Sequence, residues 1–418
     1  MTKNNYLFPF IMITSLFFMW GFVHNLDPIL IPHLKKSFSL STLQASLVDS
    51  AVFIAYFIMA LPAGFLMKKY GYKTGIIMGL LLFAIGSFLF IPAANTQSYF
   101  FFLFALFIIA CGLTILETAA NPYASLLGPP ESSSFRLNFA QSFNGLAATL
   151  APIIGAKIIL TKGYSEAELS SMTDSARQIA LASEASTVKM PYFILGSIIL
   201  VIAVIFFFLK LPEIKETKEQ EGEKTGIIHA LKHRHLSWAV VAQFFYVGAQ
   251  VCVFSFFILY ATKAAGIDEQ KAAQYAGYGM GMAFMIGRFF GTFLMKFIKP
   301  DRLLAIYALI NVMLCVVAIM SGGTVALYAV IGIAFFMSIM FPTIFSLGIK
   351  DLGKDTKFGS SLIIMSIVGG AILPPVMGYI SDETHNIQTG YIIPLICFVV
   401  VFLFGLNGHK VIKRTSYE

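Results

Sequence analysis

Long apolar runs recur along the chain, and short polar segments separate them. Twelve such runs are centred near residues 19, 56, 84, 110, 149, 200, 250, 283, 311, 336, 368 and 398. A helix of about 20 apolar residues spans the hydrocarbon core of a bilayer. The pattern therefore predicts an all-α integral membrane protein with twelve transmembrane helices. The first run, residues 6–31, is too long for the core of a signal peptide and lacks a small-residue cleavage site, so we count it as helix 1.

Composition and charge agree with this prediction. Hydrophobic residues make up 58% of the 418-residue chain and charged residues only 12%. The net charge of +8 does not indicate a nucleic-acid partner, because the basic residues are sorted by side. With both termini in the cytoplasm, 20 Lys and Arg residues fall inside and 7 outside. We expect a multi-pass protein of the bacterial inner membrane with both termini cytoplasmic.

The chain divides into two similar parts. Residues 1–210 form the predicted N-terminal six-helix half, residues 211–236 a charged cytoplasmic linker, and residues 237–418 the C-terminal six-helix half. The segment 121–128 and the segment 341–348 share Pro, Leu and Gly in register. Weakly similar halves with interrupted helices at matching places are typical of secondary transporters, whose substrate site lies between the halves. We expect the outer loop 161–189 to be partly helical.

Glu117 is the most informative charge in the sequence. It lies inside an apolar run, where an unpaired charge costs roughly 2.5 to 3.5 kcal/mol. Thr114, Glu117 and Asn121 share one helix face, and Pro122 interrupts the helix directly after them. This pattern predicts a polar stripe that faces a cavity, while the alternative is a buried structural hydrogen bond. Asp27 shares a face of helix 1 in the same way with two other residues, Trp20 and His24.

Amide side chains mark two further polar faces. Helix 5 carries Asn138, Gln141 and Asn144, and helix 7 carries Gln243, Tyr246 and Gln250. Amides offer both donors and acceptors, so these faces suit a polar ligand. The alternative is that they only join helices to one another.

Several sequence blocks resemble the fucose, galactose and glucose permease branch of the major facilitator superfamily. The resemblance spans nearly the whole chain. The turn 64–73 is similar to the basic loop that this superfamily has between helices 2 and 3, with Lys68 at the usual position of an Asp. The blocks are Leu116–Pro122, Arg136–Asn144, Tyr246–Gln250, Phe341–Lys350, Gly359–Ser361 and Gly378–Asp382.

The resemblance implies an activity and roles for individual residues. It implies proton-coupled import of a neutral hexose or deoxyhexose, with L-fucose first. It assigns proton coupling to Glu117 and, less directly, to Asp27, because Pro28 occupies the place where the family has its acid. It assigns sugar binding to Asn144. Phe254 stands where the fucose symporter has Trp.

The remaining polar and aromatic candidates follow from the same expectation. We expect sugar contacts from the other amides, and stacking on the sugar ring from Trp20, Tyr246 and Phe284, although aromatic residues at helical spacing more often serve packing. Arg288 is expected to anchor the cytoplasmic end of helix 8. The candidate amides are Asn138, Gln141, Gln243 and Gln250.

Other classes of function remain as alternatives. The near alternative is a glucose, galactose or other sugar permease of the same family. A proton-coupled exporter of hydrophobic compounds predicts an apolar cavity. A membrane glycosyl-transfer enzyme needs a loop domain with metal or nucleotide-sugar ligands. We expect no enzyme activity, metal or cofactor, because the chain has no phosphate-binding glycine loop and its cysteines lack metal spacing. The proton is the expected coupling ion, and the sugar and the lipid bilayer are the expected partners of a functional monomer.

Overall fold

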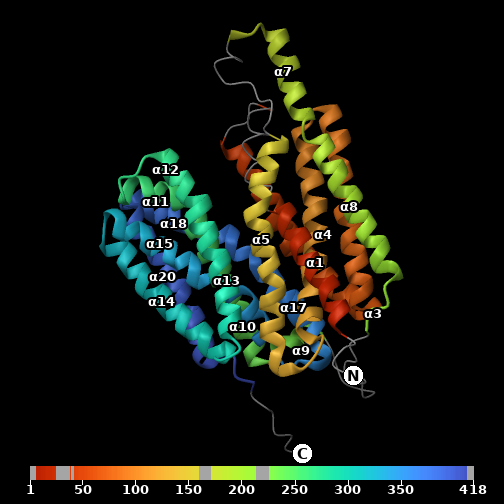
Figure 1. Ribbon diagram of the computed structural model, residues 1–418, viewed down its shortest axis with the longest axis vertical. Helices are drawn as coiled ribbons and strands as arrows, with labels where there is room; N and C mark the ends of the chain where they lie inside the picture. Colours follow the sequence, from red (N-terminus) through yellow and green to blue (C-terminus); the bar gives the residue numbers. More distant parts are fainter. Residues whose placement is uncertain (1–5, 25–37, 39–41, 160–170, 213–225, 412–418) are drawn as a thin grey trace, which may run out of the picture.

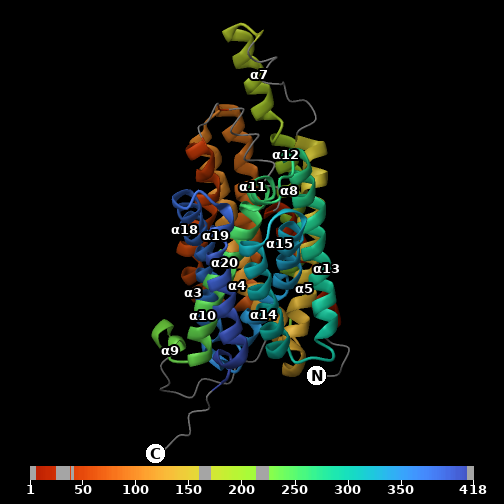
Figure 2. The ribbon, with the colours of Figure 1, turned by 90° about the vertical axis from the view of Figure 1, so that its left-hand side faces the viewer.

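The computed structural model describes residues 6–24, 38, 42–159, 171–212 and 226–411, and in these ranges the secondary structure is helical. Figures 1 and 2 show two groups of long helices side by side, with α9 at one end of the molecule and α7 and α12 at the other. We call the end at α9 the linker end.

The first group holds the helices of the N-terminal half. α3 packs against α4 and α8, and α1 packs against α5. The outer loop was expected to be partly helical, and α7 confirms it for the described part. The bounds are α1 (Leu7–His24), α3 (Thr42–Thr96), α4 (Tyr99–Leu126), η1 (Pro130–Ser132), α5 (Ser133–Ile159), α7 (Asp174–Ser186) and α8 (Lys189–Phe208).

The second group repeats this arrangement with more interruptions. Helices α15 and α16 follow one another closely, as do α17, η4 and α18. The bounds are α9 (Ile227–Leu231), α10 (Arg234–Ser255), α11 (Phe257–Ala264), α12 (Glu269–Gln274), η2 (Tyr275–Gly281), α13 (Met282–Leu294), α14 (Pro300–Met320), α15 (Gly323–Met337), α16 (Met340–Gly348), η3 (Gly353–Asp355), α17 (Thr356–Met365), η4 (Ser366–Val368), α18 (Gly369–Glu383), α19 (Ile387–Gly390), α20 (Ile392–Leu403) and η5 (Phe404–Gly408).

The twelve predicted spans are present in the described residues once these interruptions are taken into account. α3 contains two of them, because Gly71 has a φ of 82° that bends the chain between helices 2 and 3. Eight stretches are long and apolar enough to cross a bilayer by themselves. The outward face of α8 exposes Val201, Val204 and Phe208, as a lipid-facing helix does.

Gly64, at the other end of the predicted turn, has a different role. It lies inside α3, where a side chain would collide with the hydroxyl of Ser361 on α17. The two halves therefore approach closely at this point.

Arg136 joins the end of α4 to the beginning of α5. Its guanidinium is buried and donates to the carbonyl oxygens of Ala124 and Pro129, at 3.2 and 2.7 Å, and also to that of Ser125. The last carbonyls of a helix have no partners in the helix itself. Arg136 therefore supplies donors to a helix end that would otherwise be buried without them.

Glycine also permits the close packing of α3 on α4. A Cβ atom on Gly112 would lie 2.6 Å from the backbone nitrogen of Phe83 and 2.7 Å from the carbonyl oxygen of Gly79. Backbone atoms cannot move aside as a flexible side chain can. The two helices therefore require a residue without a side chain here.

We predict that Gly112→Ala lowers the free energy of unfolding by about 1 to 3 kcal/mol through overpacking. Thermal unfolding of the purified protein in detergent measures this. Gly277→Ala is the control, because a Cβ there has open space. Equal unfolding temperatures for the two variants would contradict the close packing.

Candidate functional site

The carboxyl group of Glu117 forms a hydrogen bond across two helices. The hydroxyl of Tyr56, on α3, donates to Oε1 of Glu117 at 2.7 Å. Tyr56 is buried, whereas Glu117 is only partly buried. The membrane carboxyl group is thus held by a neutral donor and is not fully enclosed.

The expected polar stripe on α4 is only partly present. The hydroxyl of Thr114 donates to the carbonyl oxygen of Ala110 in its own helix, at 2.8 Å, so it is directed at the helix backbone. Asn121 lies on the stripe and is fully buried, and its Oδ1 accepts a hydrogen bond from Gln141 on α5, at 3.1 Å. Glu117 and Asn121 therefore bond to side chains of other helices, while the hydroxyl of Thr114 bonds within α4.

Arg288 connects the two halves. Its Nε donates to the carbonyl oxygen of Ser338, at 2.8 Å, and its Nη1 donates to that of Gln141 in the first half, at 2.9 Å. The guanidinium also lies 4.6 Å from the ring centre of Phe284. Among the described residues no carboxylate pairs with it, so carbonyl oxygens and an aromatic face stabilise this buried charge.

This position differs from the sequence expectation for Arg288. We expected an anchor at the end of helix 8, but α13 continues to Leu294 beyond it. The contacts explain the difference, because the guanidinium reaches sideways to α5. The side chain passes next to Gly145 on α5, where a Cβ atom would lie 3.7 Å from Cδ of Arg288, an ordinary van der Waals distance.

Asn138 and Asn144 lie in different surroundings on α5. Asn138 is fully buried and donates to Oγ1 of Thr343, on α16 of the other half, at 3.1 Å. Asn144 is partly exposed and faces α1, where a Cβ on Gly21 would lie 2.7 Å from its Nδ2. Asn138 therefore joins the halves, while Asn144 remains accessible.

The candidates on helix 7 are mostly enclosed. Gln243 and Tyr246 have no exposed surface, and neither amide atom of Gln243 has a hydrogen-bond partner among the described residues. Gln250 is partly exposed. The ring of Phe254 meets that of Phe284 edge to face, at 5.6 Å. Helix 7 thus carries two enclosed groups and one accessible amide, and α10 packs mainly on α18, α20 and α16 of its own half.

The candidates on helix 1 are only partly described. Trp20 is 2% exposed and packs on Phe17, with ring centres 4.2 Å apart. Asp27 lies outside the described residues, and so does the side chain of His24. The structure therefore shows hydrogen-bond partners for Glu117, Gln141 and Arg288. It does not describe Asp27, the second proposed coupling acid.

Polar contacts between the halves gather toward the linker end. Besides the bond between Asn138 and Thr343, the hydroxyls of Ser134 and Ser346 lie 2.7 Å apart, and Ser360 donates to the carbonyl oxygen of Thr118 at 2.8 Å. These are bonds of small neutral groups. The halves are therefore closed on each other at this end by contacts that are individually weak.

Sequence reasoning did not find Tyr56, Thr343 or Ser338. Each is a partner supplied by another helix, and helical spacing within one run says nothing about it. A hydroxyl in an apolar run was the only available signal, and many such hydroxyls bond to their own helix, as that of Thr118 does to the carbonyl oxygen of Thr114.

Comparisons with known proteins agree with this architecture. The family described as the Major Facilitator Superfamily matches residues 10–362. The L-fucose-proton symporter of Escherichia coli is 44% identical over 96% of this chain and 93% of its own. The glucose/galactose transporter of Brucella abortus is 41% identical over 98% and 96%. A crystal structure of a transporter in the outward conformation matches with a TM-score of 0.90, 44% identity, and 96% and 99% of the two chains.

We predict that Arg288→Ala destabilises the protein, because two charge-assisted hydrogen bonds are lost, each worth roughly 1.5 to 3 kcal/mol. Arg288→Lys recovers only part of the loss, since an ammonium cannot reproduce the guanidinium fork. Thermal unfolding in detergent provides the measurement, with the exposed Arg302 replaced by Ala as control. Full stability of Arg288→Ala would show that the bridge between the halves is not needed, and full stability of Arg288→Lys would show that the guanidinium fork is not needed.

Proposed function

The chain belongs to the Major Facilitator Superfamily, and we propose that it is a secondary active importer that carries a neutral sugar, L-fucose, together with a proton. The observation that carries the proposal is the hydrogen bond between Tyr56 and Glu117 in the membrane part of the N-terminal half. The similarity to the Escherichia coli symporter over nearly the full length of both chains supports the same substrate and coupling ion.

Glu117 is the proposed site of proton coupling. An apolar surrounding favours the neutral form of a carboxyl group. We therefore propose that Glu117 carries a proton while the halves move and its access changes from one side of the membrane to the other. Tyr56 positions the carboxyl oxygen without supplying a charge. Asp27, which lies outside the described residues, is the proposed second coupling acid.

The sugar is proposed to bind between the halves. Asn144 and Gln250 are partly exposed in this conformation and are the first contacts that we propose. The enclosed candidates become available as the halves move, and the aromatic ones stack on the ring or on the methyl group of a deoxyhexose. These candidates are Asn138, Gln141, Gln243, Tyr246, Trp20 and Phe284.

Alternating access follows from the contacts at the linker end. For the sugar to leave on that side, the bonds from Ser134 to Ser346, from Asn138 to Thr343 and from Ser360 to Thr118 must break. The basic residues assign the linker end to the cytoplasm. We propose residues 1–210 and 237–418 as the moving units, a location in the bacterial inner membrane, and function as a monomer.

A proton gradient supplies enough energy for this work. One charge that crosses 100 mV releases about 2.3 kcal/mol. Since about 1.4 kcal/mol corresponds to a factor of ten, one proton per neutral sugar supports roughly fifty-fold accumulation.

The second candidate is the same mechanism with D-glucose or D-galactose. The 41% identity to the glucose/galactose transporter of Brucella abortus favours it. An exporter of hydrophobic compounds is less well supported, because the interface contains the polar side chains of Asn121, Gln141 and Arg288.

We expect proteoliposomes with the purified protein to accumulate labelled L-fucose when an inward proton gradient is imposed. An excess of unlabelled D-galactose or D-glucose should compete only weakly, because these sugars differ from the deoxyhexose in stereochemistry and carry an additional hydroxyl. No accumulation of labelled L-fucose, together with gradient-driven accumulation of labelled D-galactose or D-glucose, would transfer the assignment to the second candidate.

We further predict that Glu117→Gln abolishes proton-driven accumulation and keeps exchange of labelled for unlabelled sugar. Glutamine preserves the volume and a hydrogen bond with Tyr56 but cannot release a proton. Accumulation and counterflow in the same liposomes separate the two effects. Glu131→Gln, at an exposed residue of η1, is the control, and undiminished accumulation by Glu117→Gln would refute the coupling role.

A further inference from the structure

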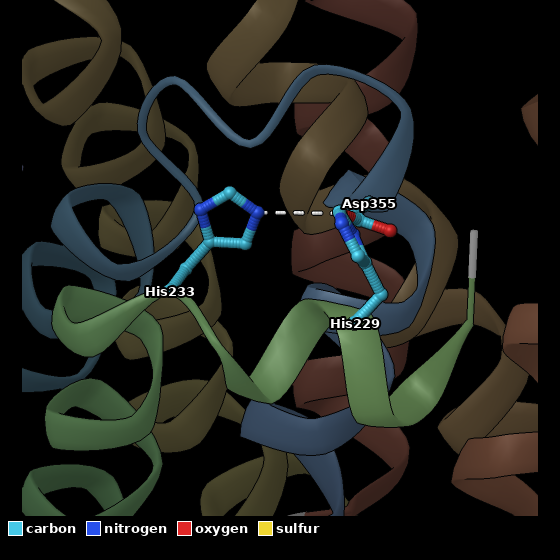
Figure 3. Close-up of side chains that lie close together, drawn as sticks. All are labelled: His229, His233 and Asp355. Carbon is cyan, nitrogen blue, oxygen red and sulfur yellow. Dashed lines mark hydrogen bonds and ion pairs between the residues drawn. The ribbon is translucent and has the colours of Figure 1, made fainter. Parts of the chain in front are cut away.

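Three side chains with metal-binding groups meet at the linker end, outside the transport site (Figure 3). His229 lies on α9, His233 is the residue before α10, and Asp355 ends η3. Nδ1 of His229 and Nε2 of His233 lie 2.6 and 3.2 Å from Oδ2 of Asp355. Two histidines, one on α9 and one at the beginning of α10, thus meet one carboxylate that comes from η3, much later in the chain.

The distances are close to those that a small cation requires. One ligand atom from each residue lies within 4.8 Å of the others. Zinc bonds of about 2.0 to 2.2 Å place the ligand atoms of a tetrahedral site roughly 3.3 to 3.5 Å apart. The side chains of His229 and His233 are 39% and 32% exposed. Small rotations of the imidazole rings would widen the spacing between the ligand atoms to that of a zinc site. The partial exposure of both histidines lets an ion enter from solvent.

The burial of Asp355 is the independent observation that points to a ligand. Its side chain is 2% exposed, and its Oδ1 has no hydrogen-bond partner among the described residues. Buried carboxylate oxygens are rarely left without a partner. A cation bound to Asp355 and both histidines supplies the missing interaction.

We propose that His229, His233 and Asp355 form a binding site for a divalent transition-metal ion, of which Zn²⁺ is the best match. Two imidazole nitrogens and one carboxylate oxygen suit zinc, whereas Mg²⁺ and Ca²⁺ prefer oxygen ligands. Three protein ligands leave the fourth position of a tetrahedral ion for water. The sequence predicts no metal site from its cysteine spacing, and Asp355 is too distant from the two histidines in the chain for a spacing motif to link them.

The site has a mechanical consequence. α9 belongs to the segment that follows the first half, and η3 leads directly into α17. α17 contacts the first half through Ser360, and through Phe358, whose ring lies 5.0 Å from that of Phe65. A bound ion therefore fixes the linker helix to the element that closes the linker end.

The test is zinc binding by the full-length protein, purified in detergent with a tag that contains no histidine. After removal of metals with a chelator, the protein is dialysed against Zn²⁺ with excess Mg²⁺, and bound zinc is measured by elemental analysis. We expect one zinc ion per chain, lost in His229→Ala and in His233→Ala. His409→Ala is the matched control, because His409 pairs with Asp301 at 3.5 Å and no third ligand joins them among the described residues. The four cysteines are buried and do not compete.

Thermal unfolding gives a second readout. Zinc should raise the unfolding temperature of the wild type and of His409→Ala, but not that of the two site variants. If alanine at position 229 or 233 already destabilises the metal-free protein, the glutamine variant at that position is used in place of the alanine variant, because glutamine keeps a hydrogen bond to Asp355. Absence of zinc from the wild type, or zinc retained by the site variants, would overturn the proposal.

Discussion

The free-energy cost of burying a charged or polar group without a partner determines how the polar residues of this membrane protein are arranged. Glu117 is tolerated because Tyr56 donates to it, and Arg288 because two carbonyl oxygens and the ring of Phe284 surround its guanidinium. These partners come from other helices, and in the case of Arg288 from the other half. These two charged groups therefore also hold helices in place.

Contacts between the halves combine close approach with weak bonds. Gly64 brings α3 next to Ser361, and hydroxyl and amide groups such as Ser134 and Asn138 form the polar contacts. Hydrogen bonds between helices in membranes average about 0.6 kcal/mol. A small set of them can close one end of the molecule and still open within a transport cycle. The buried bond from Arg288 to the carbonyl oxygen of Gln141 carries a charge and is stronger.

Much of the fold could be predicted from the sequence, because length and apolarity alone define a membrane helix. The break at Gly71 and the importance of Glu117 were also visible, since a glycine in a basic turn and an acid in an apolar run are local signals. The sequence could not reveal the partner of Glu117 or the direction of Arg288, which depend on neighbouring helices. It also could not show that the hydroxyl of Thr114 donates to its own helix, because helical spacing gives the face of a residue and not the hydrogen bond of its hydroxyl. The meeting of His229 and Asp355 could not be predicted either, because the two residues are distant in the chain and only the fold brings them together.

The central claim is that sugar and proton move together through this protein. The most direct measurement is the external pH of a weakly buffered suspension of proteoliposomes after addition of L-fucose, with no gradient imposed and an ionophore present to remove any membrane potential. The account predicts that the external medium becomes more alkaline as sugar enters, and that liposomes without protein show no change. Entry of L-fucose without any change in external pH would contradict it.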